Sequence, residues 1–388
     1  MHSRQVRVDP IILGDPKRTR VCTTRCVLHA TSHRAFPSRV ALRRALALAA
    51  APRLTRICVL ANGTMAEASS AAPTSLDELT IKETNQLGKG ASAIVRVATT
   101  TAGARYAIKI VEKAKIVGQH QLTRLFREKD LLGALNHSSI VAFFGTLKDE
   151  GHLYFLLELV PGGELLWHMQ RDRRHQVHAN DAKVVLGALC LPLRHMQELN
   201  ILYRDLKPPN ILFTSTGRLK LVDFGHAKRI EGHGFDEERS TSVIGTPHYQ
   251  APETVRGDGH GLPAQLWALG VLLAEMSMGI PPFWPVGPKL NDLILKADPD
   301  LTPLPAEAKA LAQALLTAEP ADRASAFGGK GYAGVMGHAY FDGFDWAGVE
   351  AGRVVPQFDF GAHAAEMVGV REPDDEEVES LSKVFADF

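Results

Sequence analysis

The chain has 388 residues, of which 45% are hydrophobic, so it is long enough for two or three domain-sized units with a substantial buried core. Its 44 Lys and Arg residues nearly balance 43 Asp and Glu residues, so net charge gives no reason to expect binding to nucleic acid or to a membrane surface. The presence of only four cysteines argues against a disulfide-stapled secreted domain.

The first 64 residues differ from the rest of the chain. They contain twelve Lys and Arg residues against two acidic residues, and apolar residues alternate with arginines in the segment 40–46, as in an amphipathic helix. This composition fits an organelle transit peptide, a disordered basic extension, or a chain whose true start is Met65. No apolar run approaches the roughly 20 residues that cross a bilayer. We therefore predict a disordered or transit-like extension over residues 1–75 and no transmembrane segment.

Short alternating segments begin near residue 80 and predict paired strands over residues 93–99 and 105–111, joined by a turn at 100–103. A glycine-containing segment precedes them, and glycines let the backbone approach anionic oxygens and direct amide groups toward them. A plain hairpin turn is the alternative for this segment, because alanine replaces the third glycine that a phosphate-binding loop would contain. The residues of the candidate loop are Leu87, Gly88, Lys89, Gly90, Ala91, Ser92 and Ala93.

The second of these strands carries Lys109 inside an apolar run, and the segment 122–135 that follows has apolar residues at helical spacing. A lone lysine on a strand ordinarily faces solvent. A desolvated lysine needs an acidic partner, however, and Glu128 lies where it can reach inward from the predicted helix. The order of loop, lysine and glutamate favours a lysine that holds phosphates and is itself held by a carboxylate.

The most specific segment covers residues 201–212, where two apolar runs flank a charged loop. Asp205 can accept the proton of an incoming hydroxyl, Lys207 can neutralise charge on a transferring phosphoryl group, and Asn210 can ligate a metal ion. A purely structural polar loop is the alternative. In the hairpin that follows, Asp223 ends an apolar strand beside a glycine, and its carboxylate is a hard oxygen donor that suits Mg²⁺.

The segment 245–253, Gly-Thr-Pro-His-Tyr-Gln-Ala-Pro-Glu, completes a set of motifs whose order matches the protein kinase signature. Over residues 80–388 the chain resembles the AGC group of Ser/Thr protein kinases, nearest to the catalytic subunit of cyclic-AMP-dependent protein kinase. The terminal Phe-Ala-Asp-Phe is typical of this group, in which the tail returns to fill a pocket on the small lobe. Further support comes from the segments 157–164, 225–229 and 267–272.

The resemblance implies an α+β fold of two lobes with a C-terminal tail. A small antiparallel sheet with one main helix would cover residues 76–160, a larger and mostly helical lobe 161–345, and a tail that wraps the small lobe 346–388. It also implies ATP and Mg²⁺ as cofactors, protein substrates with basic motifs, and a separate cyclic-nucleotide-binding regulatory subunit. We expect such an enzyme in the cytoplasm and also in the nucleus, with organelle targeting by residues 1–64 left open.

By the same resemblance, Asp205 orients the substrate hydroxyl with the help of Lys207. Lys109, paired with Glu128, holds the nucleotide phosphates. The implied ligands of two Mg²⁺ ions are Asn210 and Asp223. Beside the glycine-containing loop, the residues implied to hold ATP are Val95, Ala107, Lys109, Glu158, Val160, Glu164 and Leu212.

The resemblance places Ser242 at the usual activation-loop phosphorylation position, with Thr241 as a near neighbour. A phosphate adds a charge of about −1.5 to −2 and needs cations around it. Arg124, Arg204 and Lys228 fall at the matching basic positions. A loop serine that is never modified is the alternative.

Two acidic positions of the family, here Glu164 and Glu275, read arginines upstream of the target hydroxyl, and Thr246 belongs to the same substrate-binding surface. We therefore expect a basophilic enzyme. Pro209 replaces a usual glutamate, which should weaken the preference for arginine two residues upstream and leave the reading three residues upstream to Glu164. Gln265 replaces an aspartate that normally anchors the catalytic loop, so we expect a looser loop.

Three other functions compete with an active cyclic-AMP-dependent type of kinase. A pseudokinase scaffold would be favoured by the loss of Lys109, Asp205, Asn210 or Asp223, but all four are present. A small-molecule phosphotransferase would not need the segment 245–253, which organises a peptide platform. A kinase of the cyclic-GMP-dependent type stays open.

Overall fold

The structure is a computed structural model that describes residues 72–89, 93–116, 118–230, 245–284 and 288–363. Several predicted features lie outside these ranges: nearly all of the basic extension, the loop residues Gly90, Ala91 and Ser92, the phosphorylation positions Thr241 and Ser242, and the tail beyond residue 363. No helix in the described ranges combines the length and the apolar character that crossing a bilayer requires.

The small lobe is built on a five-stranded sheet with the strand order β1-β2-β3-β5-β4, in which every neighbouring pair is antiparallel. Strands β2 and β3 agree with the sequence prediction to within one residue at each end. Gly103, whose φ of 84° suits glycine, makes the turn between them. The strands are β1 (Leu79–Lys89), β2 (Ala93–Thr100), β3 (Arg105–Glu112), β4 (Phe143–Lys148) and β5 (His152–Glu158).

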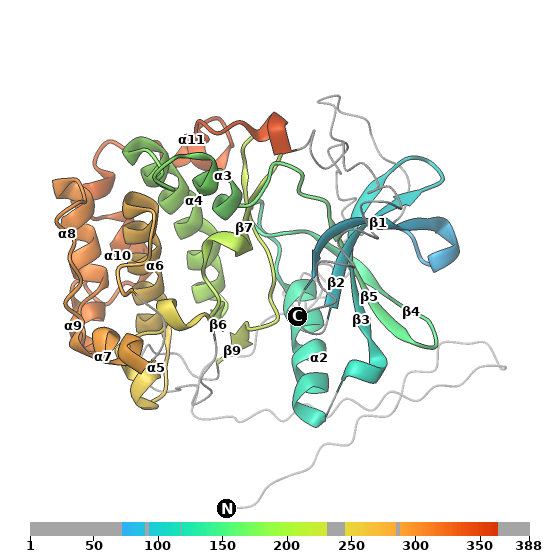
Figure 1. Cartoon of the computed structure of the whole chain (residues 1–388), viewed down its shortest axis with the longest axis horizontal. Coiled ribbons are helices and arrows are strands. Elements are labelled where there is room, and N and C mark those ends of the chain that lie inside the picture. The colour runs from blue at the N-terminus through green and yellow to red at the C-terminus, as the bar shows by residue number, and fades with distance from the viewer. Residues whose placement is uncertain (1–71, 90–92, 117, 231–244, 285–287, 364–388) are drawn as a thin grey trace, which may run out of the picture. The chain divides into compact units, whose positions relative to one another are not determined.

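The main helix of this lobe, α2 (Gln119–Ala134), lies beside the sheet (Figure 1). Glu128, Leu131 and Leu132 are buried, and their spacing places them on one face of the helix. Phe126, on the other side, is 55% exposed. The inward face of α2 therefore carries one carboxylate into the interior together with its leucines. Short 3-10 helices precede the sheet and the helix, η2 (Leu76–Glu78) and η3 (Lys113–Lys115).

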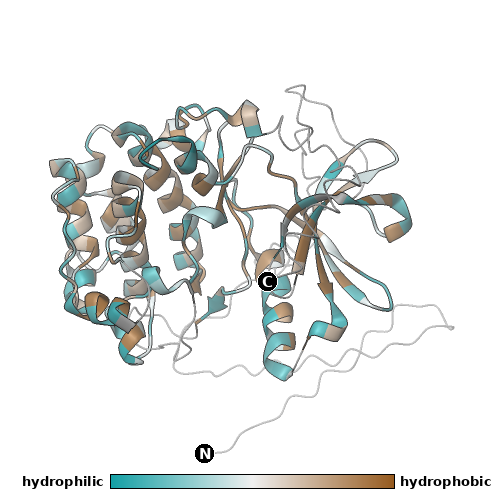
Figure 2. Cartoon of the chain, viewed as in Figure 1, coloured by the Kyte–Doolittle hydropathy of each residue, from teal (hydrophilic) through white to brown (hydrophobic). Residues whose placement is uncertain are grey.

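The large lobe is organised around α6 (Leu262–Met278), a helix that is apolar on nearly all sides. Leu266 and Trp267 are fully buried, as expected for a helix that other elements surround. Figure 2 shows more apolar residues on the inner helices of this lobe than on the outer ones. The helix ends at Gly279, whose φ is 82°, and a Cβ at this position would overlap the carbonyl oxygen of Arg174.

The other elements of the large lobe pack around α6 or form the short hairpins that face the small lobe. The helices are α3 (Leu165–Arg171), α4 (Ala179–Glu198), α5 (Pro252–Arg256), α7 (Pro288–Lys296), α8 (Ala306–Leu315), α9 (Pro320–Ser325), α10 (Tyr332–Met336) and α11 (Trp346–Glu350). The short strands and 3-10 helices are β6 (Ile201–Leu202), η4 (Pro208–Asn210), β7 (Ile211–Phe213), β8 (Leu219–Leu221), β9 (Lys228–Arg229), η5 (Pro247–Tyr249) and η6 (Ala339–Phe341).

A buried ion pair connects α9 to the beginning of α5. The guanidinium of Arg323, which is fully buried, donates to both carboxylate oxygens of Glu253, at 2.8 and 3.2 Å. Its remaining hydrogens go to the carbonyl oxygens of Pro263, Thr317 and Ala318. All the donors of this arginine therefore have partners, which a buried charge requires.

Backbone hydrogen bonds join the segment before β4 to strand β8 of the large lobe. The amide of Val141 donates to the carbonyl of Leu221, and the amide of Leu221 donates to the carbonyl of Ser139. Lys220 on β8 also forms an ion pair of 2.7 Å with Glu158 at the end of β5.

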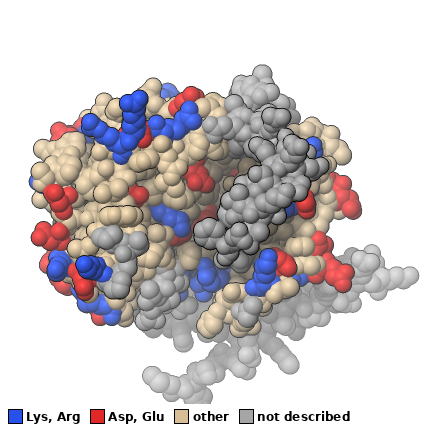
Figure 3. Space-filling view, viewed as in Figure 1, with Lys and Arg blue, Asp and Glu red and all other residues tan. Residues whose placement is uncertain are grey.

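Lys, Arg, Asp and Glu side chains all occur on the face of the molecule seen in Figure 3. The predicted α+β fold, with a small antiparallel-sheet lobe and a larger helical lobe, is confirmed.

Candidate active site

A lysine between two carboxylates joins the two lobes. The Nζ atom of Lys109 on β3 lies 2.7 Å from Oε1 of Glu128 on α2 and 3.4 Å from Oδ1 of Asp223, which follows β8. Burial alone would lower the pKa of Lys109, but the two carboxylates outweigh it and the pKa is raised. The lysine therefore stays charged where anionic phosphates would bind. This contact agrees with the pairing of Lys109 and Glu128 expected from the sequence.

Asp223 is held in a backbone conformation that ordinary residues rarely adopt, with a φ of 52°. Its Oδ1 accepts a hydrogen bond of 3.2 Å from the amide of Gly225. Burial acts to raise the pKa of this carboxyl group, but the charge of Lys109 and the Gly225 amide prevail and lower it. The side chain is thus an ionised oxygen donor, which is the state that a metal ion needs.

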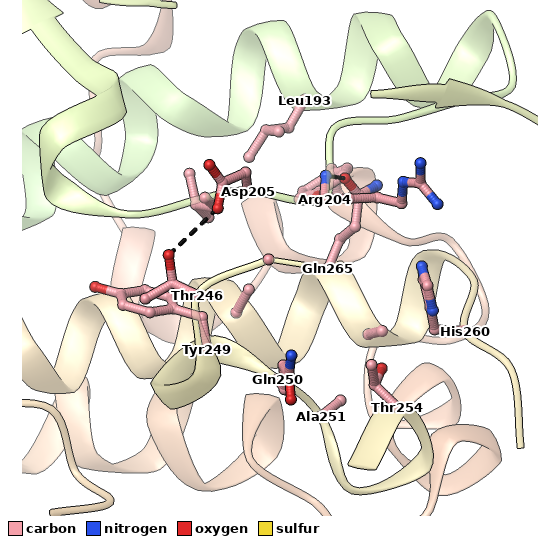
Figure 4. Close-up of a pocket in the computed structure, with 15 residues that line it drawn as sticks. Leu193, Arg204, Asp205, Thr246, Tyr249, Gln250, Ala251, Thr254, His260 and Gln265 are labelled. Carbon is pink, nitrogen blue, oxygen red and sulfur yellow. Dashed lines mark hydrogen bonds between the residues drawn. The ribbon is translucent and has the colours of Figure 1, made fainter. Parts of the chain in front are cut away.

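Asp205, in the loop between β6 and η4, is held by three donors. Its Oδ2 lies 2.9 Å from Nζ of Lys207 and accepts a hydrogen bond of 2.9 Å from Nδ2 of Asn210. Its Oδ1 accepts a hydrogen bond of 3.3 Å from the hydroxyl of Thr246, as Figure 4 shows. These contacts bring together four residues that the sequence analysis assigned to catalysis, metal binding and substrate binding. The carboxylate has a fixed orientation as a result.

Gln265 on α6 is hydrogen-bonded to the backbone of the loop that carries Asp205. Its Oε1 accepts the backbone N–H of Tyr203 at 2.6 Å and that of Arg204 at 3.3 Å. Together with Asp205 and His260 it lines a cavity, which Figure 4 shows in close-up. The volume of this cavity is about 40 Å³. An amide oxygen therefore makes the two hydrogen bonds to the backbone that a carboxylate oxygen is able to make. The looser loop expected from this replacement stays a prediction, although both backbone N–H groups have an acceptor in Gln265.

The residues expected to cover the nucleotide lie at matching positions on neighbouring strands. Gly88 on β1 pairs with Val95 on β2, and Val95 pairs with Lys109 on β3. Ala107, two residues from Lys109, is buried in the same strand. This end of the sheet also carries the described remainder of the candidate loop, namely Leu87, Lys89 and Ala93.

The segment that leaves β5 connects the lobes beside this site. The carboxylate of Glu158 is already occupied, because it accepts from Lys220 at 2.7 Å and from the amide of Ala142 at 3.0 Å. Both bonds are accepted by Oε2, so protein groups hold this side chain, and the part in nucleotide binding that the resemblance implies for Glu158 stays a prediction. The other predicted residues here are Val160, which is buried, and Glu164, which bridges to Leu212 on β7.

The basic residues expected to hold an activation-loop phosphate come from three elements. Arg124 on α2 lies 3.3 Å from the ring of His226, and Nε of Arg204 donates to the carbonyl of His226 at 2.7 Å. Burial and the charges of Arg204 and Lys228 lower the pKa of His260 to about 4. Arg124 and Arg204 therefore both contact His226, and Lys228 follows two residues later at the start of β9. No motif in the sequence had marked His226 or His260 as a neighbour of these cations.

The two acids expected to read substrate arginines are both partly or largely buried. Burial raises the pKa of Glu275, which accepts a hydrogen bond from the hydroxyl of Tyr249. Burial also raises the pKa of Glu164, while the charge of His363 acts in the opposite direction. His363 was not predicted, because no motif marks it and it is distant from Glu164 in sequence.

A model of the protein kinase domain matches residues 81–341. The chain is 34% identical over 268 residues to the cAMP-dependent protein kinase catalytic subunit of Dictyostelium discoideum, covering 68% of this chain and 40% of the relative. It is 34% identical over 277 residues to the Serine/threonine-protein kinase gad8 of Schizosaccharomyces pombe, covering 70% and 47%. It is 35% identical over 257 residues to the cGMP-dependent protein kinase egl-4 of Caenorhabditis elegans, covering 65% and 32%. The chain thus spans less than half the length of each of these relatives.

Proposed function

Because the chain belongs to the protein kinase family, we propose that it transfers the γ-phosphoryl group of ATP to serine or threonine hydroxyls of protein substrates. The resemblance to this family expected from the sequence motifs is confirmed. The observation that carries the proposal is the position of Asp205, whose carboxylate is fixed by Lys207, Asn210 and Thr246.

The donor set fits a magnesium nucleotide. Asp223 offers an ionised carboxylate and Asn210 an amide oxygen, both of which are ligand types that Mg²⁺ prefers. Lys109 offers a positive charge for the phosphates of the same nucleotide. A Mg²⁺ ion held by Asp223 and Asn210 would neutralise part of the negative charge of the nucleotide phosphates. Protein kinases in general use ATP and Mg²⁺, and these residues are the ones that would hold them in this chain.

The protein's own contribution is mainly to position the reactants. Asp205 accepts a hydrogen bond from the substrate hydroxyl, which directs a lone pair of that oxygen toward the phosphorus atom. Lys207, which already contacts Asp205, supplies positive charge beside the transferring group. Thr246 holds the other carboxylate oxygen of Asp205 in place. Positioning of this kind is the larger part of catalysis for phosphoryl transfer, because its loose transition state requires little covalent help.

We propose that the substrates carry an arginine three residues upstream of the target and that Glu164 binds it. Replacing Glu164 by glutamine should lower kcat/KM for such a serine peptide by about 10- to 100-fold, since a charge-assisted hydrogen bond contributes about 1.5 to 3 kcal/mol. A peptide with uncharged citrulline at that position should be affected little. Both values come from steady-state phosphate transfer from ATP.

A matched control for this prediction is Glu307→Gln, because the side chain of Glu307 is 69% exposed and lies on α8. We expect that control to phosphorylate both peptides at the wild-type rate. Equal losses for the arginine and citrulline peptides in Glu164→Gln would contradict the assignment of Glu164 as the reader, while leaving phosphate transfer itself in place.

We further propose that a separate cyclic-nucleotide-binding subunit controls the enzyme. The support is similarity to a cAMP-dependent catalytic subunit and to a cGMP-dependent kinase. Adding a cyclic-AMP-binding regulatory subunit should suppress peptide phosphorylation, and cyclic AMP should restore it. No suppression at saturating regulatory subunit would contradict control of this kind.

A further inference from the structure

Helix α2 contacts the segment that follows Asp223 at two positions one helical turn apart. At the first, Nε of Arg124 donates to the carbonyl oxygen of Gly225 at 3.4 Å. At the second, a Cβ added to Gly225 would lie 3.5 Å from Oε2 of Glu128 and 3.2 Å from Oδ1 of Asp223. Residues four apart lie on one face of a helix, so the same face of α2 meets this segment twice.

The imidazole of His226 extends the first of these contacts. The Nη2 atom of Arg124 lies 3.4 Å from Nδ1 and 3.3 Å from Nε2 of His226. A guanidinium can only donate, so a ring nitrogen of His226 is the acceptor. The backbone of His226 is held by the large lobe, because Nε of Arg204 donates to its carbonyl oxygen at 2.7 Å. This residue therefore connects α2 to the loop that carries the catalytic carboxylate, and Figure 1 shows the neighbouring strand β9 beside α2.

These contacts lie next to the lysine that the proposed function assigns to the nucleotide phosphates. Glu128, four residues after Arg124 on α2, pairs with Lys109 at 2.7 Å. Asp223, three residues before His226, lies 3.4 Å from the same lysine. A shift of α2 away from this segment would separate the two carboxylates that hold Lys109 between them.

We propose that Arg124 and His226 are positioning residues for the proposed reaction. Their contact holds α2 where Glu128 orients Lys109 toward the nucleotide phosphates. This role differs from the phosphate binding that the sequence analysis expected of Arg124, because the carbonyl of Gly225 and the imidazole are acceptors that the protein itself supplies. The inference rests on the proposed function.

The test is a fluorescence titration of the full chain with labelled ADP and Mg²⁺, without a peptide. Arg124→Met and His226→Leu should each raise the dissociation constant by about fivefold, the size of one modest hydrogen bond. The double variant should bind no more weakly than either single variant, since the same contact is lost only once. His226→Asn should stay close to the wild type, because its amide oxygen replaces the accepting nitrogen.

The matched control is Lys129→Met, which removes one positive charge from the same helix. Its Nζ lies 5.8 Å from the ring centre of Phe126, a side chain that is 55% exposed. This control should bind the nucleotide as the wild type does. In phosphate transfer, Arg124→Met should raise KM for ATP and leave KM for the peptide unchanged, because Lys109 holds the nucleotide and not the peptide.

Repeating the titration in a chain with Thr241→Ala and Ser242→Ala separates the two roles of Arg124. Neither position can carry a phosphate in that chain, so the effect of Arg124→Met there comes from the contact with His226. We expect the same fivefold loss of affinity. A loss that disappears in this chain would assign Arg124 to the phosphate alone and overturn the inference.

Unchanged affinity in both single variants, or losses that multiply in the double variant, would also overturn the inference and leave the proposed function intact. A wild type that binds labelled ADP but phosphorylates no arginine-containing serine peptide would overturn the proposed function instead. The affinities of the variants would still decide whether Arg124 and His226 position the nucleotide site.

Discussion

Replacing Asp205 by alanine is expected to lower kcat for peptide phosphorylation by about 10²- to 10⁴-fold. The substitution removes the carboxylate that orients the substrate hydroxyl, and it also removes the shared partner of Lys207, Asn210 and Thr246. KM for ATP should change less, because Lys109 and Glu128 remain paired. The measurement is steady-state phosphate transfer from ATP to an arginine-containing serine peptide.

The control for this variant is Asp298→Ala, since Asp298 is exposed on the loop after α7 and should leave turnover unchanged. A thermal unfolding curve close to that of the wild type would show that the Asp205 variant is folded. Equal turnover by wild type and Asp205→Ala would mean that the observed activity does not come from this site. That outcome would favour the pseudokinase scaffold.

Replacing Arg323 by methionine is expected to destabilise the protein by about 3 to 5 kcal/mol, the cost of leaving a buried charge without its partner. The carboxylate of Glu253, which is 2% exposed, would lose both donors, and the carbonyl of Pro263 would lose its donor as well. Urea denaturation followed by circular dichroism measures the effect as a lower midpoint. An exposed arginine on the same lobe provides the control variant, Arg353→Met, which should leave the midpoint unchanged.

The double variant Arg323→Met with Glu253→Met separates charge from packing. Removing both members of a buried pair is often close to neutral, because neither charge is then left unpaired. We therefore expect the double variant to be more stable than Arg323→Met alone. If the two single losses simply added, the ion pair would not be the cause of the destabilisation.

The sequence was informative wherever chemistry and spacing coincide within a short stretch. The alternation of residues 93–99 and 105–111 located β2 and β3, because a strand repeats every two residues. The charged loop around Asp205 was recognisable because Asp205, Lys207 and Asn210 serve one reaction and lie within six residues of each other. The helix containing Glu128 was predicted from its apolar spacing, but its start was not. It begins after Gly118, which has no side chain to cap the helix.

Contacts between distant residues that belong to no motif were not predictable. Arg323 and Glu253 are 70 residues apart, and His363 and Pro161 are 202 apart. Neither arginine nor histidine at these positions belongs to a motif or to a periodic pattern. Their importance comes from burial and from the partners that the fold supplies. The sequence likewise indicated that Gln265 lacks a charge, but not that one amide oxygen would meet two backbone N–H groups.

The uncharged side chain of Gln265, which holds the backbone of the catalytic loop, affects how such chains are classified. A survey that sorts related sequences by the acid usually found at position 265 would place this one among the inactive members. The backbone N–H groups of Tyr203 and Arg204 need only an acceptor oxygen within hydrogen-bond distance. The amide of Gln265 provides this oxygen and has no carboxyl group to protonate. Its hold on the loop should therefore persist in acidic media that would protonate a carboxylate.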